Sequence, residues 1–143
     1  MTKYLVTGST GFIGSRLLGL LSTIECDIRL LSKSKVNNYE TVVCNLEQDR
    51  ISKHTLESVD TVFHLAGFAH DIQYTSKVKD LYRVINVDAT VELARLAIES
   101  GIKRFVFVRS VKLADCQIQN IVQVRRSRMI RKGFMEKRNE KLN

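Results

Sequence analysis

The sequence lacks the cysteine pairs, long apolar runs and repeats that are typical of disulfide-rich, membrane-spanning and repeat proteins. It has three cysteines, an odd number with no Cys-x-x-Cys pair, which argues against a disulfide framework and a zinc knuckle. No apolar run approaches the length that spans a bilayer, and there is no low-complexity segment or internal repeat. The opening "MTKYLVTG" is too short and too soon broken for a signal peptide. We therefore expect a cytoplasmic globular domain with reduced thiols, no metal site and no membrane contact.

Negative charge is scarce at one end of the chain only. Residues 1–115 carry 15 basic and 13 acidic residues, a net charge of +2, whereas residues 116–143 carry 8 and 2, a net charge of +6. The excess of +8 therefore belongs mainly to the end of the sequence. We expect one domain over 1–115, followed by a basic tail over 116–143 that is helical or disordered.

Apolar runs alternate with helical patterns along the first 110 residues. Runs typical of buried strands are found at 3–7, 27–32, 41–46, 61–67 and 104–110, and helical spacing at 12–22 and 84–99, with a shorter helical turn within 52–58. Strands that alternate with helices predict a parallel sheet covered on both faces. No sixth strand follows, so we expect a doubly wound α/β sheet that stops after about five strands, with the basic tail behind it.

A glycine-rich turn separates the first expected strand from the first expected helix. Gly8, Gly11 and Gly14 recur at every third position in "TGSTGFIGS". A helix N-terminus in such a place offers free N–H groups and the positive end of the helix dipole to a pyrophosphate. Gly8 would permit the turn, Gly11 the approach of a phosphate, and Gly14 close packing of helix on strand. The motif predicts a dinucleotide site in preference to a purely structural turn, and the missing Gly-Lys-Ser/Thr excludes a P-loop.

Four segments together resemble a known family. "VTGSTGFIGS", "HLAGFAH", "INVDAT" and "FVFVRSVK" come in the order and spacing of the extended short-chain dehydrogenase/reductases, in particular the nucleotide-sugar epimerases and dehydratases. The similarity covers residues 3 to about 113. It implies a Rossmann-like sheet that binds NAD or NADP across the carboxyl ends of its strands.

The resemblance also implies a set of cofactor-binding residues. These are Gly8, Thr10, Gly11, Phe12, Ile13, Gly14, Ser32, Lys33, Asn45, Leu46, Leu65, Ala66, Gly67 and Asn86. Ser32 stands where NAD-binding members keep an acid for the ribose hydroxyls, and Lys33 and Lys35 lie beside it. Their charge would attract a 2'-phosphate, which slightly favours NADP over NAD, although both lysines could equally be solvated loop charges. Asn45 stands where the family usually has an Asp that binds the adenine amine.

Further positions follow from the same resemblance. The loop from His64 to Gly67 would lie against the nicotinamide, and we do not expect His64 to bind a metal because neither His54 nor His70 has ligand spacing to it. Asn86 matches an Asn that holds its helix against the active-site strand, although it could also be a surface residue. Ser110 matches the family's catalytic Ser or Thr, which hydrogen-bonds the reacting oxygen.

The second half of the family's catalytic machinery is missing. Catalysis in the family needs a Tyr as general acid/base and, four residues on, a Lys that lowers its pKa. All four tyrosines precede Ser110, and Phe134 and Arg138, about where the pair is expected, can do neither job. The pattern ends abruptly after Leu113, as a shifted reading frame or an early stop would leave it; this is a hypothesis that the gene's other frames would test.

Three functions therefore remain open. The first is the NAD(P)-binding part of an epimerase/dehydratase-like protein that is not catalytically competent alone, which we prefer. The second is an active epimerase, dehydratase or reductase of a nucleotide sugar, completed by a partner. The third is a nucleic-acid binder that uses the basic tail, which matches no nucleic-acid motif. Homo-oligomers are conceivable through the helix at 84–99, by which family members commonly dimerise.

Overall fold

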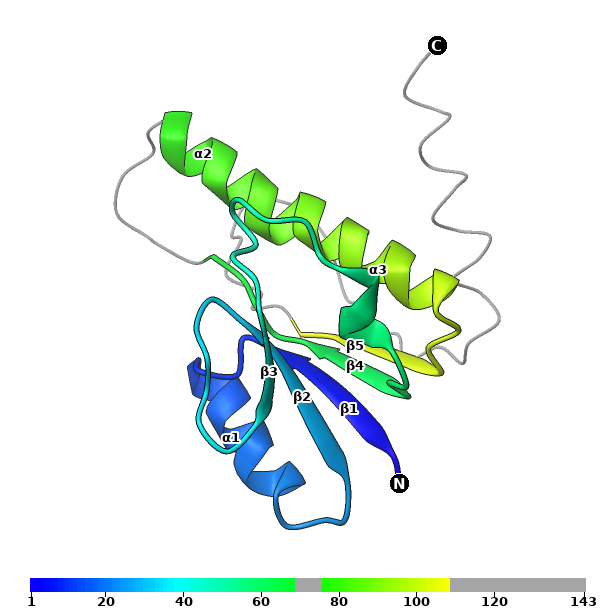
Figure 1. Cartoon of the computed structure of the whole chain (residues 1–143). Helices are drawn as coiled ribbons and strands as arrows, with labels where there is room; N and C mark the ends of the chain where they lie inside the picture. The colour runs from blue at the N-terminus through cyan, green and yellow to red at the C-terminus, as the bar shows by residue number, and fades with distance from the viewer. Residues whose placement is uncertain (69–75, 109–143) are drawn as a thin grey trace, which may run out of the picture. The chain divides into compact units, whose positions relative to one another are not determined.

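Five apolar runs form the strands of one parallel sheet in the computed structural model, which describes residues 1–68 and 76–108 (Figure 1). The strands are β1 (Lys3–Thr7), β2 (Asp27–Ser32), β3 (Glu40–Val43), β4 (Thr61–His64) and β5 (Arg104–Phe107). The order across the sheet is β3-β2-β1-β4-β5. The chain therefore moves outwards from β1 first on one side and then on the other, which is the doubly wound arrangement that the sequence predicts.

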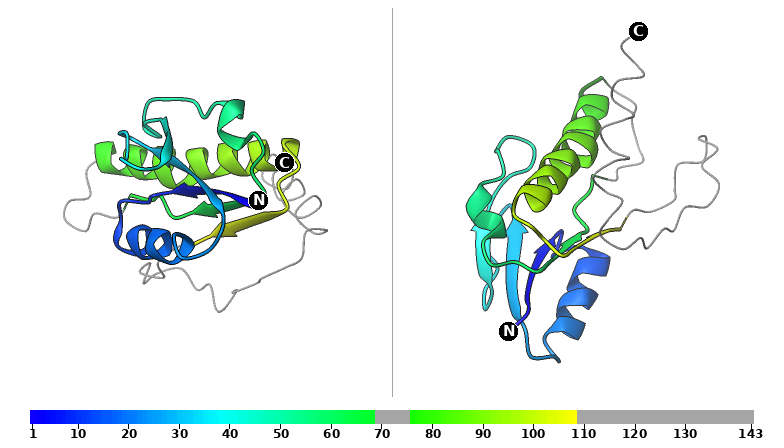
Figure 2. Two further views of the ribbon diagram at one scale, coloured as in Figure 1. Left: turned by 60° about the horizontal axis from the view of Figure 1, so that its bottom comes forward. Right: turned by 90° about the vertical axis from the view of Figure 1, so that its right-hand side faces the viewer.

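Helices cover the sheet on both faces (Figure 2). They are α1 (Phe12–Leu21), the 3-10 turn η1 (Lys53–Leu56), α2 (Ser76–Arg83), the π-helical turn η2 (Val84–Asp88) and α3 (Ala89–Glu99). The segments α2, η2 and α3 form one continuous rod, and Figure 2 shows it on the opposite face of the sheet from α1. Within residues 1–68 and 76–108, no helix is both long and apolar enough to cross a membrane.

The side chains of β1 alternate between two apolar clusters. Leu5 packs with Val62 and with Leu93 of α3, while Val6 packs with Leu30 and with Leu18 of α1. Leu5 and Val6 are both fully buried. Because successive strand residues point to opposite faces, a central strand between two helical layers must be apolar throughout.

Several boundaries differ from those the sequence predicts, and β5, expected to run to Ser110, ends at Phe107. β3 ends at Val43 because the next residues turn: the Asn45 carbonyl accepts the N–H groups of Gln48 and Asp49. β4 ends at His64, where the chain leaves the sheet as a loop. The long helix begins at Ser76, eight residues before its expected start. Val78, Leu81 and Tyr82 have helical spacing and are half-buried, so the signal for α2 was present in the sequence and the expected start at Val84 overlooked it.

We predict that Leu93→Ala lowers the free energy of unfolding by about 2–5 kcal/mol, because it leaves a cavity under a fully buried side chain. Urea unfolding followed by circular dichroism measures the change. Leu20→Ala is the matched control: its side chain on α1 is 68% exposed, and it should shift the free energy of unfolding by less than about 0.5 kcal/mol. Equal losses in the two variants would contradict the assignment of the core.

Candidate functional site

Gly8 makes a turn that only glycine fits. It directly follows β1, has a φ of +70°, and its carbonyl accepts the Gly11 N–H at 3.1 Å. A Cβ on Gly8 would lie 2.6 Å from the backbone nitrogen of Ala66, in the loop after β4. The positive φ and the tight contact both require glycine. The first glycine of the motif therefore also brings the loops after β1 and β4 together.

Gly14 lets α1 approach the turn itself. A Cβ on Gly14 would lie 2.1 Å from the Gly8 carbonyl oxygen and 2.7 Å from Ser9 Cα. The sequence argument places this contact on the strand, whereas the structure places it on the two residues that follow the strand. A Cβ on Gly11 would meet only the Gly8 carbonyl oxygen within 4 Å, at 3.3 Å. Gly11 therefore lies in more open surroundings, as an approach for a ligand requires.

Among the residues that the structure describes, the N-terminus of α1 has no side-chain cap and no acidic residue in its first turn. Gly11 is its N-cap residue. The side chains that bond this turn, Ser15 and Arg16, donate to the Phe12 carbonyl and do not cap its N–H groups. Phe12 and Ile13 turn their side chains to the surface, 74% and 53% exposed, and contribute their backbone to the turn. Such an end carries a partial positive charge and N–H groups suited to an anion.

A cavity of about 340 Å³ lies beside this turn, at the carboxyl ends of the strands. Nine of the predicted cofactor residues line it: Gly8, Thr10, Gly11, Ser32, Lys33, Leu46, Leu65, Ala66 and Gly67. Phe12, Ile13, Gly14, Asn45 and Asn86 do not line it. The reversal of strand order between β1 and β4 places the cavity at the topological switch point of the sheet, where doubly wound folds bind ligands.

Five further residues that sequence reasoning missed complete the lining. They are Leu31, Ser34, Cys44, Phe68 and Ile85. Leu31 lies near the end of β2, and Ser34, Cys44 and Phe68 follow β2, β3 and β4. Their places at the carboxyl ends of expected strands could have marked them as cavity residues. Burial raises the pKa of the Cys44 thiol, and the negative charges of Asp49 and Glu92 raise it further. Cys44 is therefore a protonated, unreactive part of the wall.

Among the described residues that line this cavity, Lys33 is the one that is charged. Its Nζ lies 3.8 Å from Glu47 Oε2, and both side chains are exposed. No acid stands at Ser32, which ends β2. The edge of the cavity beside β2 therefore carries the positive charge of Lys33, whose ion pair with Glu47 is long and exposed to solvent.

Asn45 has a structural task in its turn. Its Oδ1 accepts the Glu47 N–H at 3.2 Å, and its own N–H donates to Asp49 Oδ2 at 2.7 Å. The predicted contact with adenine would have to use the second lone pair of Oδ1. The backbone turn around Asn45 is what orients Leu46 towards the cavity.

His64 is fully buried at the end of β4, and hydroxyl groups contact both of its ring nitrogens. Thr7 Oγ1 lies 2.7 Å from Nδ1, and Thr90 Oγ1 lies 2.8 Å from Nε2. The ring stacks on Phe107 with centroids 5.3 Å apart. Burial lowers the pKa of His64 to about 4, so the imidazole is neutral at physiological pH.

Asn86 holds the loop after β4. Its Oδ1 accepts the Phe68 N–H at 2.8 Å, and its Nδ2 donates to the Phe68 carbonyl at 2.9 Å. The resemblance assigns this Asn a contact with the active-site strand, whereas here the contact is with the loop that lines the cavity. Ser110, Phe134 and Arg138 lie outside the described residues, as does the basic tail.

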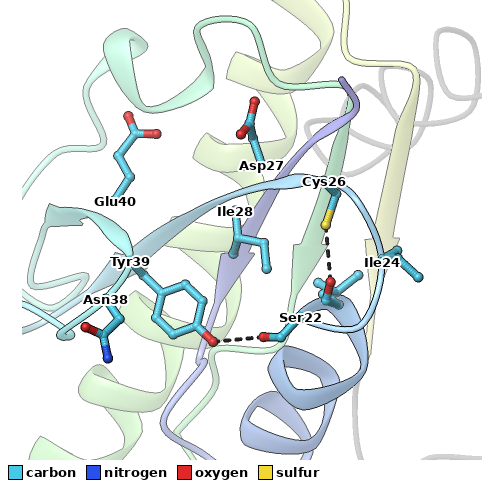
Figure 3. Close-up of a pocket in the computed structure, with 9 residues that line it drawn as sticks. Ser22, Ile24, Cys26, Asp27, Ile28, Asn38, Tyr39 and Glu40 are labelled. Carbon is cyan, nitrogen blue, oxygen red and sulfur yellow. Dashed lines mark hydrogen bonds between the residues drawn. The ribbon is translucent and has the colours of Figure 1, made fainter.

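A second hollow, of about 270 Å³, lies at the opposite, amino-terminal ends of β2 and β3 (Figure 3). The hydroxyls of Tyr39 and Ser22 lie 3.1 Å apart there, and Cys26 Sγ donates to the Leu21 carbonyl at 3.4 Å. Glu40 is bound by Lys3 and Arg29. These polar groups satisfy one another, and none of the predicted cofactor residues lines this hollow.

Sequence comparison connects this geometry to known proteins. The model of the NAD dependent epimerase/dehydratase family matches residues 4–124. UDP-glucose 4-epimerase from Vibrio cholerae is 34% identical over 115 residues, which cover 76% of this chain and 35% of that protein. A 3-beta-hydroxysteroid dehydrogenase from Mycolicibacterium neoaurum is 26% identical over 117 residues, covering 76% of this chain and 32% of that protein.

Solved structures agree with the family match. A short-chain dehydrogenase/reductase superfamily protein from Agrobacterium tumefaciens, with bound NAD, superposes with a TM-score of 0.66 at 29% identity, covering 76% of this chain and 32% of that one. MoeE5 in complex with UDP-glucose and NAD gives 0.65 at 26% identity, covering 76% and 36%. The chain thus spans about a third of the length of these relatives.

We predict that Gly14→Ala destabilises the chain by more than about 1 kcal/mol, because its methyl group would overlap the Gly8 carbonyl. Gly19→Ala is the matched control in the same helix: a Cβ there meets nothing within 4 Å. Alanine is the better helix former by up to about 1 kcal/mol, so Gly19→Ala should be neutral or stabilising. Thermal and urea unfolding compare the two variants, and similar behaviour of both would contradict the close approach of α1 to the turn.

The buried imidazole predicts a pH dependence of stability. The pKa of His64 is lowered from 6.5 to about 4 on folding, so the unfolded chain takes up the proton first. The stability gained from a neutral His64 is complete above about pH 6.5 and is lost at up to about 1.4 kcal/mol per pH unit as the pH falls towards 4. Urea unfolding of the wild type and of His64→Gln, at several pH values between 7 and 5, measures it.

The difference between the two proteins isolates His64. Glu40 and Asp60 also have lowered pKa values, because Arg29 and Lys103 respectively donate hydrogen bonds to them. The stability that these two carboxylates contribute to the fold is therefore also lost as the pH falls. Both carboxylates are present in both proteins, so their contributions cancel. We expect a shallower pH dependence for His64→Gln over this window. Parallel curves would mean that His64 is not buried as a neutral ring.

Proposed function

Because the chain belongs to the NAD dependent epimerase/dehydratase family, we propose that it binds an adenine dinucleotide, NAD or NADP, at the carboxyl ends of β1, β2 and β4. One observation carries the proposal. The uncapped N-terminus of α1 adjoins a cavity of about 340 Å³ between the loops that follow β1 and β4. A pyrophosphate would receive there the N–H groups and the positive end of the helix dipole, which no side chain within residues 1–68 and 76–108 caps.

The residues present fit such a ligand. Gly11 keeps a side chain away from the turn, where a Cβ would lie 3.3 Å from the Gly8 carbonyl oxygen, and the first turn of α1 contains no acidic residue that would repel a phosphate. Of the lining residues within the described part of the chain, Lys33 is a cation and none is an acid. Apolar walls from Leu31 and Leu46 suit the flat face of a base.

Each part of the cofactor has a group of residues to receive it. The turn Gly8–Gly14 would hold the pyrophosphate, Ser32 and Lys33 the ribose of the adenosine half, Leu46 and Asn45 the adenine, and the loop Leu65–Gly67 the nicotinamide half. When bound, the nicotinamide supplies the capacity to accept and return a hydride. The protein's part is to bind and orient the dinucleotide, through backbone held in place by Gly8 and Asn86.

The residues beside β2 favour NADP over NAD. Ser32 replaces the acid that would repel a 2'-phosphate, and Lys33 lies next to it with only a 3.8 Å contact to Glu47. Relatives crystallised with NAD support the dinucleotide class without deciding the phosphate. We therefore propose a modest preference for the phosphorylated cofactor.

We propose a nucleotide sugar as the substrate class of the complete enzyme to which this cofactor site would belong. MoeE5 is described with UDP-glucose, and the Vibrio cholerae relative is a UDP-glucose 4-epimerase. The present sequence contains no Tyr-x-x-x-Lys after Ser110. Residues 1–143 by themselves should bind the cofactor without turnover, because they contain no Tyr–Lys pair in the position that the family uses.

A binding titration tests the proposal. We expect purified chain to enhance the fluorescence of NADPH and of NADH, with a several-fold lower Kd for NADPH. Ser32→Asp should reverse this preference, because a carboxylate repels the 2'-phosphate and bonds the ribose hydroxyls. Ser32→Ala, which removes the hydroxyl without adding charge, should keep it.

The same sample, given UDP-glucose and cofactor, should form no product above background. Absence of binding of either cofactor at millimolar concentration would refute the site. Product formation by the isolated chain would refute the absence of turnover.

A further inference from the structure

Hydrogen bonds hold the described part of the loop after β4, Leu65–Phe68, at Leu65 and Ala66 on one side and at Phe68 on the other. We propose that His64 is a positioning residue: as a neutral imidazole with its proton on Nε2, it couples the end of β1 to the π-helical turn η2 and thereby holds the backbone of Leu65–Phe68 in the shape that receives the cofactor. The inference rests on the proposed function for what the loop receives. The coupling itself rests on the geometry.

Thr7 determines which nitrogen carries the proton. Its Oγ1 accepts the N–H of Leu65 at 3.2 Å, a donor shared with the Thr7 carbonyl, and the N–H of Ala66 at 3.1 Å. A hydroxyl accepts two hydrogen bonds and donates one, so its own proton points to His64 Nδ1, 2.7 Å away. Nδ1 is therefore the acceptor and carries no proton.

The other side of the ring continues the chain. His64 Nε2–H donates to Thr90 Oγ1 at 2.8 Å, and the Thr90 hydroxyl donates to the Asn86 carbonyl at 3.0 Å. The side-chain donors of Thr7, His64 and Thr90 thus each have one acceptor in this series. A protonated imidazole would need a free lone pair on Thr7, which the two backbone N–H groups already occupy. The neutral tautomer is thus the form that the site accommodates.

The π-helical turn places the Asn86 side chain where it can bond the loop after β4. The Ala89 N–H bonds the Val84 carbonyl, five residues back, which widens the helix at this point. From here the Asn86 side chain bonds both the N–H and the carbonyl of Phe68. Gly67 lies so close that a Cβ on it would be 3.2 Å from Asn86 Oδ1. The loop is thereby bound at Leu65 and Ala66 on one side and at Phe68 on the other.

The position of these bonds indicates a role beyond filling the core. A buried polar network must be fully satisfied to avoid a desolvation cost that an apolar core would not incur. This network ends on backbone atoms of Leu65, Ala66 and Phe68, all of which line the cavity. Wide helical turns of this kind are frequent at functional sites.

Amide hydrogen exchange on the full chain tests the coupling without a ligand. Thr90→Val removes the acceptor of Nε2–H, and we expect exchange at the Phe68 amide to accelerate at least tenfold, with a smaller acceleration at Ala66. Thr90→Ser keeps the hydroxyl and should restore the wild-type rate. Thr41→Val is the matched control, because the Thr41 hydroxyl bonds Val36 and Tyr39 at the far edge of the sheet.

The outcomes separate this inference from the proposed function. Exchange at Phe68 that is unchanged in Thr90→Val, or raised equally in Thr41→Val, would overturn the coupling. If the wild type binds NADPH, Thr90→Val should weaken binding at least fivefold, and equal affinity would overturn the positioning role. If the wild type binds no dinucleotide, the proposed function fails and the positioning role falls with it, while the exchange data still decide the coupling.

The ring itself gives an independent readout. The nitrogen-15 NMR shifts of wild-type His64 should show an unprotonated Nδ1 and a protonated Nε2, unchanged between pH 8 and pH 6. This measurement needs no variant and therefore holds even if Thr90→Val fails to fold. A proton on Nδ1, or on both nitrogens, would refute the assignment.

Discussion

The contact between the start of α1 and the turn after β1 is the constraint on which the rest of the site depends. A Cβ on Gly14 would come within 2.1 Å of the Gly8 carbonyl, so the helix can take this position only with glycine there. The same turn also packs closely against the loop after β4, because a Cβ on Gly8 would lie 2.6 Å from the backbone nitrogen of Ala66. Two backbone contacts, each needing the absence of a side chain, thus fix the helix end and the neighbouring loop together.

The topology of the sheet makes this contact useful. β1 lies at the centre, and the chain leaves it first towards β2 and then towards β4, so the loops at its carboxyl end diverge around a cavity. One wall is the positive end of α1, another is the loop held by Thr7, His64 and Asn86. An anion-binding end and a fixed stretch of backbone are the two features that a dinucleotide with a charged centre requires.

Local sequence patterns predict the parts of this arrangement that depend on local physics. The consecutive apolar residues Leu5 and Val6 predict a strand buried on both faces, and Gly8 predicts the turn that follows it. Val78, Leu81 and Tyr82 also carry the helical spacing of α2, which the expected start at Val84 overlooked. The pattern does not show the turn at Asn45 that ends β3 early. It also does not show the link between Thr7, His64 and Thr90, because these residues are distant in sequence and meet only through the sheet pairing and the π-helical turn.

The most direct test of the central claim is an NMR titration of the chain with NADP, observing backbone amides. The account predicts that the signals of Gly11, Phe12, Ile13 and Gly14 move on addition of the dinucleotide and stay in place on addition of adenosine, which has no pyrophosphate. Stationary signals in this turn, with movement instead around Ser22 and Tyr39 at the opposite end of the sheet, would contradict it.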